Sequence, residues 1–250
     1  MINTPKINGE RISKRLAQAG LCSRRDAERW ISKGRVKIDG QLLISPATIV
    51  TKSNLITVDG KALPTTTNCT RLWRYYKPSG LITSHKDPYG RPTVFNYLPK
   101  NIPRVISVGR LDLNSEGLLL LSNDGSLTRQ LELPSTGLIR RYHVRVYGKL
   151  NMSKLVAIER GIAIEGVTYS SIKISLNRQN GSNAWLTVSL NEGKNREIKK
   201  VMEYFDLIVN RLIRISYGSF YLNSLKSNEI DEVSPKIVKN LKEQFGISNL

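Results

Sequence analysis

Three polar residues at alternate positions are the best candidates for chemistry in this chain. Arg110, Asp112 and Asn114 alternate with two leucines. In an extended backbone the polar side chains would share one face and the leucines the other. Four further leucines, 118–121, predict a strand buried on both faces, and 123–125 (Asn-Asp-Gly) predicts a turn that ends it. The pattern therefore predicts a carboxylate near a cation at the edge of an apolar core.

A carboxylate in such a place acts as a nucleophile or a base only while it is ionised. Burial raises the pKa of a carboxyl group, and an adjacent cation lowers it. Asp112 therefore needs a basic partner. Arg110 is one candidate, although residues two apart in a strand point the same way without necessarily touching.

The composition indicates a polyanionic partner. At 250 residues the chain can hold one large domain and a small one, and its formal net charge is +19. No apolar run approaches the ~20 residues of a membrane-spanning helix, and no signal-peptide core follows Met1. Nucleic acid is thus favoured over lipid, and we expect no membrane association.

Cysteine and histidine are too sparse to predict a metal site. Cys22 and Cys69 belong to no C-x-x-C pair, and His85 and His143 are far apart in the sequence. No phosphate-binding or dinucleotide-binding motif is present. We therefore expect a cytoplasmic protein without disulfide, metal or cofactor.

Charge and composition divide the chain into modules. The net charge is +7 over residues 1–70, +13 over 71–226 and −1 over 227–250. The short polar segment 63–70 holds a proline and is typical of a linker. We predict a small domain at 10–62, a larger domain at 71–226 and a C-terminal tail at 227–250.

The small domain is expected to contain two basic helices followed by a hairpin sheet. The domain starts near Glu10. Ile12, Leu16 and Ala19 share one face of a predicted first helix, and Gly20 is its expected stop. Ser23 is a predicted N-cap for the second helix, with Asp26 in the capping-box position. Short strands are predicted at 36–38, 41–43 and 55–58, with Asp-Gly turns after the first and the last.

The larger domain is expected to be α+β, with a mixed and mostly antiparallel sheet. Predicted strands cover 71–76, 141–147, 185–190 and 213–217, a short helix or turn covers 93–98, and a helix covers 195–205. In the strand at 141–147, Tyr142 shares a face with two valines, and three basic residues with Tyr147 lie on the other face.

Two phrases of the small domain carry a family resemblance. AGLCSRRDA at 19–27 and GRVKIDG at 34–40 resemble the alpha-L RNA-binding domain, the S-four type. The resemblance implies RNA contacts from the basic residues Arg24, Arg25, Arg29, Arg35 and Lys37. A solvated basic helix on some other small domain is the alternative, but both phrases occur in the expected order and spacing.

The larger domain resembles pseudouridine synthases of the RsuA/RluB type, which isomerise uridines in ribosomal RNA. The phrases GRLDLNSEG at 109–117, RYHV at 141–144 and EGKNREIKK at 192–200 carry this resemblance. It implies that Asp112 is the nucleophile, that Lys199 pairs with it, and that Tyr142 packs beneath the target uracil. The family often has arginine where this chain has Lys199. On pattern alone, a solvated helix face is the preferred interpretation of Lys199 and Lys200.

RNA-binding roles are also expected in two loops. Arg91 and Tyr89 lie in a proline- and glycine-rich loop that would hold open an RNA helix after the uridine leaves it. Lys194 and Arg196 in the 192–200 phrase are expected to contact RNA. The phrase at 193–197 and the segment 80–98 place the chain nearest the RluB branch, which acts on the large subunit.

The resemblance leaves several alternatives open. Small-subunit enzymes share most of these residues, and the modified uridine is not identified. The mechanism is either nucleophilic or of the glycal type. An inactive RNA-binding factor on the same scaffold, or a fragment of an aminoacyl-tRNA synthetase, would also be basic. The leading interpretation is a monomeric ribosomal RNA pseudouridine synthase.

Overall fold

The chain divides into two compact units. A computed structural model describes residues 9–64 and 69–247. The N-terminal unit runs to Thr70 and includes Pro103–Val105, and the larger unit holds Arg71–Ile102 and the chain from Ile106 onward. Residues 65–68 of the expected linker lie outside the described residues.

Two helices and short strands make up the N-terminal unit. The second helix starts as predicted, since the Asp26 N–H donates to Ser23 Oγ at 3.1 Å and the Ser23 N–H donates back to the Asp26 carboxylate at 3.4 Å. The first helix begins at Ile12, the first residue of the predicted helical face, and Glu10 and Arg11 before it pair with another strand. The elements are β1 (Glu10–Arg11), α1 (Ile12–Gln18), α2 (Arg24–Ser32), β2 (Val36–Ile38), β3 (Gln41–Leu42), β4 (Ile49–Val50), β5 (Ile56–Val58) and β6 (Lys61–Ala62).

The N-terminal unit has its own apolar core. Ile12, Leu16 and Ala27 from the two helices are fully buried against Val36 of β2. The strands β3, β2, β5 and β6 form one sheet in that order, and β1 pairs with β4. Burying both helices on one small sheet leaves their basic side chains on the outside.

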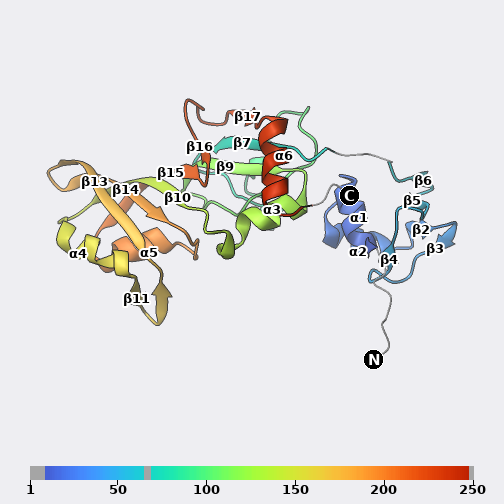
Figure 1. Cartoon of the computed structure of the whole chain (residues 1–250), viewed down its shortest axis with the longest axis horizontal. Helices are drawn as coiled ribbons and strands as arrows, with labels where there is room; N and C mark the ends of the chain where they lie inside the picture. The colour runs from blue at the N-terminus through green and yellow to red at the C-terminus, as the bar shows by residue number, and fades with distance from the viewer. Residues whose placement is uncertain (1–8, 65–68, 248–250) are drawn as a thin grey trace. The chain divides into compact units, whose positions relative to one another are not determined.

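A mixed sheet forms the centre of the larger unit (Figure 1). Among the described residues its order is β13-β14-β10-β15-β9-β7-β17, with β16 on β15 and β8 on β9. The pair β9–β15 is parallel, and the other pairs of this sheet are antiparallel. The strands are β7 (Leu72–Lys77), β8 (Ile106–Ser107), β9 (Glu116–Ser122), β10 (Arg140–Tyr147), β13 (Ile172–Asn180), β14 (Asn183–Leu190), β15 (Ile208–Tyr217), β16 (Phe220–Tyr221) and β17 (Ile230–Glu232). The predicted α+β class is confirmed.

Helices pack against several strands of this sheet. α4 and η3 pack on β13, α5 packs on β15, and α3 packs on β8 and β9. None of the helices in the described ranges is long and apolar enough to cross a membrane. The remaining elements are η1 (Val94–Asn96), α3 (Gly125–Glu132), η2 (Pro134–Thr136), α4 (Met152–Ala157), η3 (Ile158–Arg160), β11 (Ile162–Ile164), β12 (Val167–Tyr169), α5 (Glu197–Tyr204) and α6 (Pro235–Gln244).

The leucine strand is as deeply buried as its sequence predicts. The four leucines at 118–121 are all 0% exposed in β9. The expected turn after it is instead the start of α3, because the Asp124 carboxylate accepts from the N–H groups of Ser126 and Leu127 and so caps a helix.

The segment at 227–250 is more than the expected polar tail. β17 pairs with β7 at the edge of the sheet, and Val233 and Val238 are buried in the same core as Leu72 and Leu127. Figure 1 shows α6 beside β7 and β17. Most residues of α6 are polar and exposed, so its narrow apolar stripe was not recognised in the sequence.

Candidate active site

Asp112 lies in a turn just before β9 and not in an extended segment. The Ser115 N–H donates to the Asp112 carbonyl at 3.0 Å, which closes the turn. Leu111 is buried while Leu113 is 38% exposed, so the prediction that both leucines face the core is wrong for Leu113. The turn redirects the chain, which leaves the Asp112 side chain 36% exposed at the edge of the core.

Lys199 is the cation that the fold brings to Asp112. Its Nζ lies 4.0 Å from Asp112 Oδ2, and its side chain is 15% exposed. Burial lowers the pKa of Lys199, and the charge of Asp112 opposes that shift. Lys200, the next residue along α5, is exposed. The solvated-face interpretation therefore applies to Lys200 and not to Lys199.

Lys77 is a second buried cation at this turn that the sequence analysis missed. It is 0% exposed at the end of β7, and its Nζ donates to the carbonyls of Ser115 (2.7 Å), Pro78 (2.9 Å) and Leu113 (3.3 Å). Burial lowers its pKa to about 8, against the attraction of Asp112. Lys77 thus anchors the Asp112 turn to β7. A lysine at a strand end gave no signal of this burial.

A close backbone approach joins the turn to β15. Gly117 has φ +99°, and a Cβ there would lie 2.4 Å from the Arg214 carbonyl oxygen and 2.8 Å from its nitrogen. β15 pairs with β9 at Ile213–Glu116 and Arg214–Gly117. Only glycine allows the two strands to meet so closely beside Asp112.

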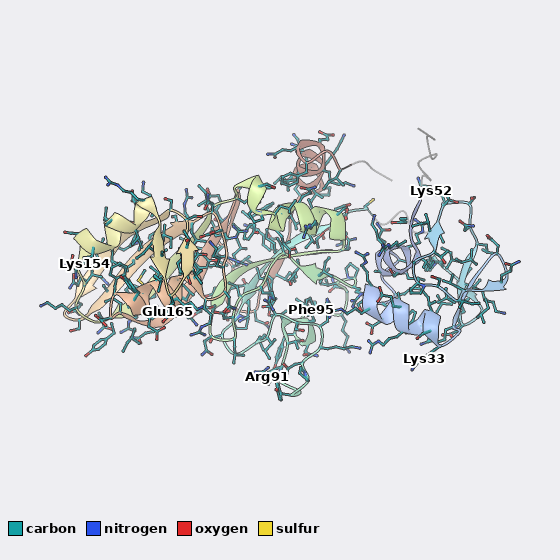
Figure 2. The ribbon with its side chains drawn as sticks, turned by 90° about the horizontal axis from the view of Figure 1, so that it is seen from below. Lys33, Lys52, Arg91, Phe95, Lys154 and Glu165 are labelled. Carbon is teal, nitrogen blue, oxygen red and sulfur yellow. The ribbon has the colours of Figure 1, made fainter. Side chains whose placement is uncertain are left out.

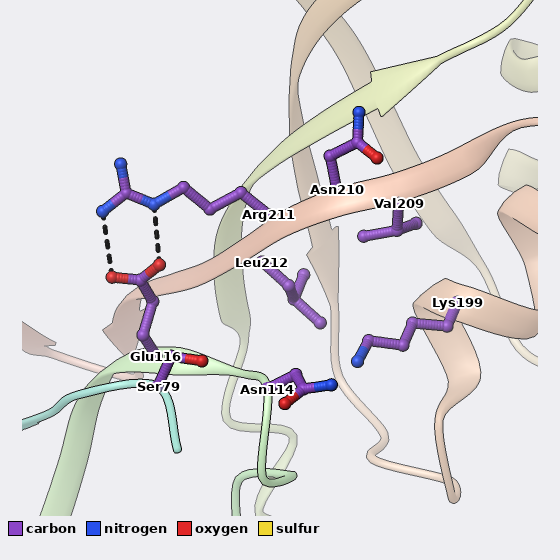
Figure 3. A pocket seen from close by; sticks show the side chains of 8 residues that line it. All are labelled: Ser79, Asn114, Glu116, Lys199, Val209, Asn210, Arg211 and Leu212. Carbon is purple, nitrogen blue, oxygen red and sulfur yellow. Dashed lines mark hydrogen bonds and ion pairs between the residues drawn. The ribbon is translucent and has the colours of Figure 1, made fainter.

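A pocket of about 290 Å³ opens where β15 separates from β9. Figure 3 shows the Lys199 side chain reaching into it from α5, with Asn114 from the Asp112 turn nearby. The other lining residues are Ser79, Glu116, Val209, Asn210, Arg211 and Leu212. Lys199 and Asn114 of the Asp112 turn thus line one cavity.

The rim of the pocket is fixed by an ion pair. Arg211 donates twice to the Glu116 carboxylate, at 2.6 and 2.9 Å (Figure 3). The Tyr76 hydroxyl donates to the same carboxylate at 2.9 Å. The hydrogen bond from Arg211 holds the pKa of Glu116 below its usual range and raises that of Arg211. A bidentate pair between β9 and β15 makes this rim rigid.

Tyr142 lies on the buried face of β10, as its alternation predicts. It is 8% exposed and pairs in register with Arg214 of β15. Arg214 is 3% exposed, its Nε donates to the Leu118 carbonyl at 2.7 Å, and its Nη2 has no protein partner. The sheet therefore holds an aromatic ring and a buried guanidinium side by side. Arg110 is exposed, and no interaction between described residues joins it to Asp112.

The two basic residues of the 192–200 phrase occupy different settings. The Lys194 ammonium donates to Glu192 at 2.8 Å and to the Thr168 carbonyl at 2.6 Å. Arg196 is exposed, with φ +52°, just before α5. Because that conformation is left-handed, α5 starts at Glu197 and not at Asn195 as predicted. Glu197 is 3% exposed, and burial raises its pKa to about 7.

The loop that contains Arg91 has an ordered internal structure. Arg91 donates to the Asp87 carboxylate at 2.8 Å, and its guanidinium lies 5.1 Å from the Tyr89 ring centroid. His85 stacks on Phe95 at 3.6 Å. Figure 2 shows Arg91 at the outer end of this loop. Tyr89 is 81% exposed, so the loop presents an aromatic and a cationic group to solvent.

The predicted RNA-binding residues of the N-terminal unit lie on its surface. Arg24, Arg25 and Lys37 are exposed, and Arg29 pairs with Asp26. Arg35 donates to Asp59 at 2.9 Å, and its guanidinium lies 4.7 Å from the Trp30 ring centroid. The unit therefore carries exposed cations on both α2 and the sheet.

Comparisons with known proteins decide the family. The family model of RNA pseudouridylate synthase matches residues 71–204, and that of the S4 domain matches residues 10–61. The chain is 54% identical over 230 residues to an uncharacterized RNA pseudouridine synthase of Rickettsia felis, covering 92% of this chain and 99% of that protein. The chain belongs to the RNA pseudouridine synthase family.

Further relatives agree with this assignment. Over 219 residues the synthase is 41% identical to the ribosomal large subunit pseudouridine synthase B of Yersinia pestis, covering 86% of this chain and 69% of that protein. A crystal structure of a pseudouridylate synthase has the same fold, with a TM-score of 0.64 at 22% identity over 92% of this chain and 99% of that one. The resemblances stated from sequence are confirmed: the protein is an enzyme that forms pseudouridine in RNA, with an S4 RNA-binding domain.

Proposed function

We propose that this synthase converts uridine to pseudouridine in large-subunit ribosomal RNA, with Asp112 as the nucleophile. The 4.0 Å contact between the carboxylate of Asp112 and the Lys199 ammonium supports this most directly. A carboxylate held beside a cation at the edge of the core can act as a nucleophile toward a carbon atom.

The reaction is an isomerisation in which atoms balance within the nucleotide. The bond between the sugar C1′ and the uracil N1 breaks while Asp112 bonds to C1′. The uracil turns and forms a new bond from C5 to C1′, which releases Asp112. C5 then loses its hydrogen to solvent, and N1 gains a proton. In the glycal alternative, Asp112 instead removes a proton from the neighbouring C2′ as the bond from C1′ to N1 breaks. The proton returns to C2′ when C5 bonds to C1′, and the C5 hydrogen is lost in the same way.

The remaining residues would hold the uridine outside its RNA helix. Tyr142 would offer its ring beneath the uracil, which offsets part of the lost base stacking. Arg110 is exposed beside Asp112. It would bind a phosphate of the RNA or occupy the position in the RNA helix that the base has left. Arg91 with Tyr89, and Arg196 before α5, would contact the surrounding RNA. Lys194 would contact RNA only by giving up its hydrogen bond to Glu192.

The S4 domain would anchor the RNA through its exposed cations. We assign it to residues 10–62, with the linker at 63–70 and the catalytic domain at 71–226, to which β17 and α6 of segment 227–250 add an edge. The name of the Yersinia pestis relative supports the large subunit as substrate. We place the enzyme in the cytoplasm, where it acts as a monomer.

Tritium release tests this proposal. Unmodified large-subunit and small-subunit ribosomal RNA labelled with tritium at uracil C5 are incubated separately with the enzyme. Release of tritium to water from the large-subunit RNA is expected, because bonding of C5 to C1′ displaces that hydrogen and the assay contains no methyl donor for substitution at C5. Release from the small-subunit RNA alone would refute the assigned substrate.

Asp112→Asn identifies the nucleophile in the same assay. The variant keeps the size of the side chain and removes its charge, so activity should disappear while RNA affinity stays within a few-fold. Asp206→Asn, at an exposed carboxylate of the same domain, is the matched control. Turnover near wild type in the Asp112 variant would refute the assignment.

A further inference from the structure

One face of the sheet is strongly basic and lies outside the site described above. The three strands β10, β13 and β14 contain no aspartate or glutamate. Their inward side chains, such as Val144, Leu186 and Ile174, are buried beneath the helices. The residues that alternate with them are exposed or half-buried. We call this surface the basic face; it consists of Arg141, Arg145, Tyr147, Lys173, Arg178 and Trp185.

The strand register aligns these side chains in rows across the sheet. Arg178 of β13 lies opposite Trp185 of β14, Trp185 lies opposite Arg145 of β10, and Arg145 lies opposite Arg211 of β15. Neighbouring strands are ~4.8 Å apart, so this row of four residues spans roughly 14 Å. Three guanidinium groups and one indole thus cross four adjacent strands.

This arrangement is unfavourable for the fold alone. Like charges directly opposite each other on a sheet destabilise it. Arg211 is neutralised by Glu116, but Arg145 has only a hydrogen bond to the Asn183 side chain at 3.2 Å. No ion pair between described residues involves Arg141, Arg145, Lys173 or Arg178. The uncompensated charge indicates a polyanion that binds from outside.

Aromatic side chains lie among the cations. Tyr147 is 49% exposed, and the half-buried Trp185 contacts His143 edge to face, with ring centroids 6.4 Å apart. A sheet surface with aromatic rings between basic residues suits a single strand of nucleic acid, whose bases stack on rings while its phosphates meet the cations.

The basic face is continuous with the pocket. Arg211 ends the row of guanidinium groups and also lines the pocket that contains Lys199. An RNA strand that delivers a nucleotide to the pocket can therefore pass Arg211 on β15 and continue across β10 toward β13. This continuity favours the substrate RNA itself over a separate acidic protein.

We infer that the basic face is a second RNA-docking surface, which binds an unpaired stretch of the substrate strand next to the target uridine. The inference rests on the proposed function for the identity of that RNA. Phosphates bind Arg145, Arg178 and Lys173, and a base stacks on Tyr147. The surface extends the contact of the catalytic domain with RNA beyond the pocket.

Salt-dependent RNA binding by the full chain tests this surface. Arg145→Gln/Arg178→Gln is compared with wild type and with Arg129→Gln/Arg160→Gln, which removes the same charge from exposed positions on α3 and η3. Binding to unmodified large-subunit ribosomal RNA is measured from low to high salt. Each lost phosphate contact in single-stranded RNA flattens the log–log slope by about 0.7, so the first variant should lose roughly 1.4 and bind several-fold more weakly.

The outcomes separate this inference from the proposed function. If the salt slope of RNA binding is flatter for the Arg145/Arg178 variant and not for the Arg129/Arg160 variant, the docking surface is supported. This holds even if the wild-type enzyme releases no tritium. Equal slopes for the two double variants would refute it. If the Arg145/Arg178 variant binds RNA like wild type but no longer binds polyglutamate, the basic face would instead be assigned to an acidic protein partner. Circular dichroism melting must show that the variants are folded.

Tyr147 provides a second, uncharged test. Tyr147→Ala should weaken RNA binding roughly fivefold or more without changing the salt slope, and Tyr147→Phe should bind like wild type, because stacking needs only the ring. Tyr221→Ala, at a similarly exposed tyrosine on β16, is the control. Equal binding by the Tyr147→Ala and Tyr221→Ala variants would exclude stacking at this surface.

Discussion

The S4 domain and the catalytic domain place their positive charge in opposite ways. In the S4 domain the cations that we assign to RNA lie on the surface, and two of them pair with Asp26 and Asp59. In the catalytic domain Lys77 and Arg214 are almost fully buried, and Lys199 is only 15% exposed. Among the described residues, the S4 domain carries only charges that solvent screens, whereas the catalytic domain, besides its exposed basic face, holds three cations that are largely removed from water.

This difference predicts how each domain responds to mutation. Exposed charges act through screened interactions, so their losses should be small, additive and dependent on salt. A buried cation determines the ionisation and position of its neighbours, so its loss should be large and depend on pH. Variants of single residues can test the contrast directly.

Lys199→Met should cause the largest loss, more than roughly a hundredfold in turnover. Burial lowers the pKa of the Lys199 ammonium, so wild-type activity should fall on the alkaline side as this cation loses its proton, and the methionine variant should lack that limb of the pH–rate profile. Lys200→Met, one residue along α5 and exposed, is the matched control and should retain activity.

Replacing the same lysine by arginine sharpens this test. Lys199→Arg keeps the charge but changes its shape, and should recover much of the activity because the sign of the charge is conserved. A pH profile that is identical in wild type and in the methionine variant would show that Lys199 does not act on Asp112, and Arg110 would become the candidate partner.

Tyr142→Ala should lower turnover by one to two orders of magnitude, whereas Tyr142→Phe should keep most of it. Stacking of a base on an aromatic ring contributes about 1–3 kcal/mol, and the phenyl ring preserves it. Single-turnover rates with the labelled RNA measure the effect, with melting temperatures as the control for the buried position. A phenylalanine variant as inactive as the alanine one would assign an acid–base role to the hydroxyl.

Lys77→Met should destabilise the catalytic domain in a way that depends on pH. The pKa of about 8 lies below the usual lysine value, so the folded state holds fewer protons than the unfolded state between about pH 8 and 10.5. Wild type therefore gains stability over that range, and the variant lacks this gain. The difference in free energy of unfolding between wild type and the variant, here called the stability gap, should widen by roughly 2–3 kcal/mol between pH 7 and 10.

Urea denaturation at both pH values measures this gap. Lys226→Met, at an exposed lysine, should show no comparable change between pH 7 and 10. A gap that stays constant with pH would mean that Lys77 keeps an ordinary pKa in the folded protein, which would contradict the burial of its charge.

Local patterns were sufficient to predict much of the fold. The alternation along 141–147, the four leucines and the capping box at Ser23 each depend on neighbours within a few residues, and the structure has all three. The turn at Asp112 was missed because alternation alone cannot distinguish an extended segment from one that a hydrogen bond bends.

The buried cations could not be predicted because distant residues create them. Lys77 is buried by carbonyls of the Asp112 turn, nearly forty residues later. Lys199 and Lys200 have the same local pattern, and only the packing of α5 on β15 directs one of them inward. The resemblance to known synthases identified Lys199, but it gave no indication of Lys77.

Removal of residues 1–63 should leave a folded catalytic domain that binds RNA more weakly. The larger unit has its own core, so its melting transition should persist. Each lost phosphate contact reduces the log–log salt slope by roughly 0.7–0.9. The full chain and the truncated chain are compared from low to high salt, and equal affinity and slope would exclude RNA docking by the S4 domain.

The smallest effects are expected from single arginines of the S4 domain. Arg24→Gln removes an exposed charge at the first turn of α2, so RNA affinity should fall only two- to threefold, with an unchanged melting temperature. Arg35→Gln also removes the contacts with Asp59 and Trp30, so it should lower the melting temperature as well. Filter binding and thermal melting measure both. A large loss of affinity in the Arg24 variant would mean that one exposed charge of this domain acts as strongly as the buried ones, and the contrast between the two domains would not hold.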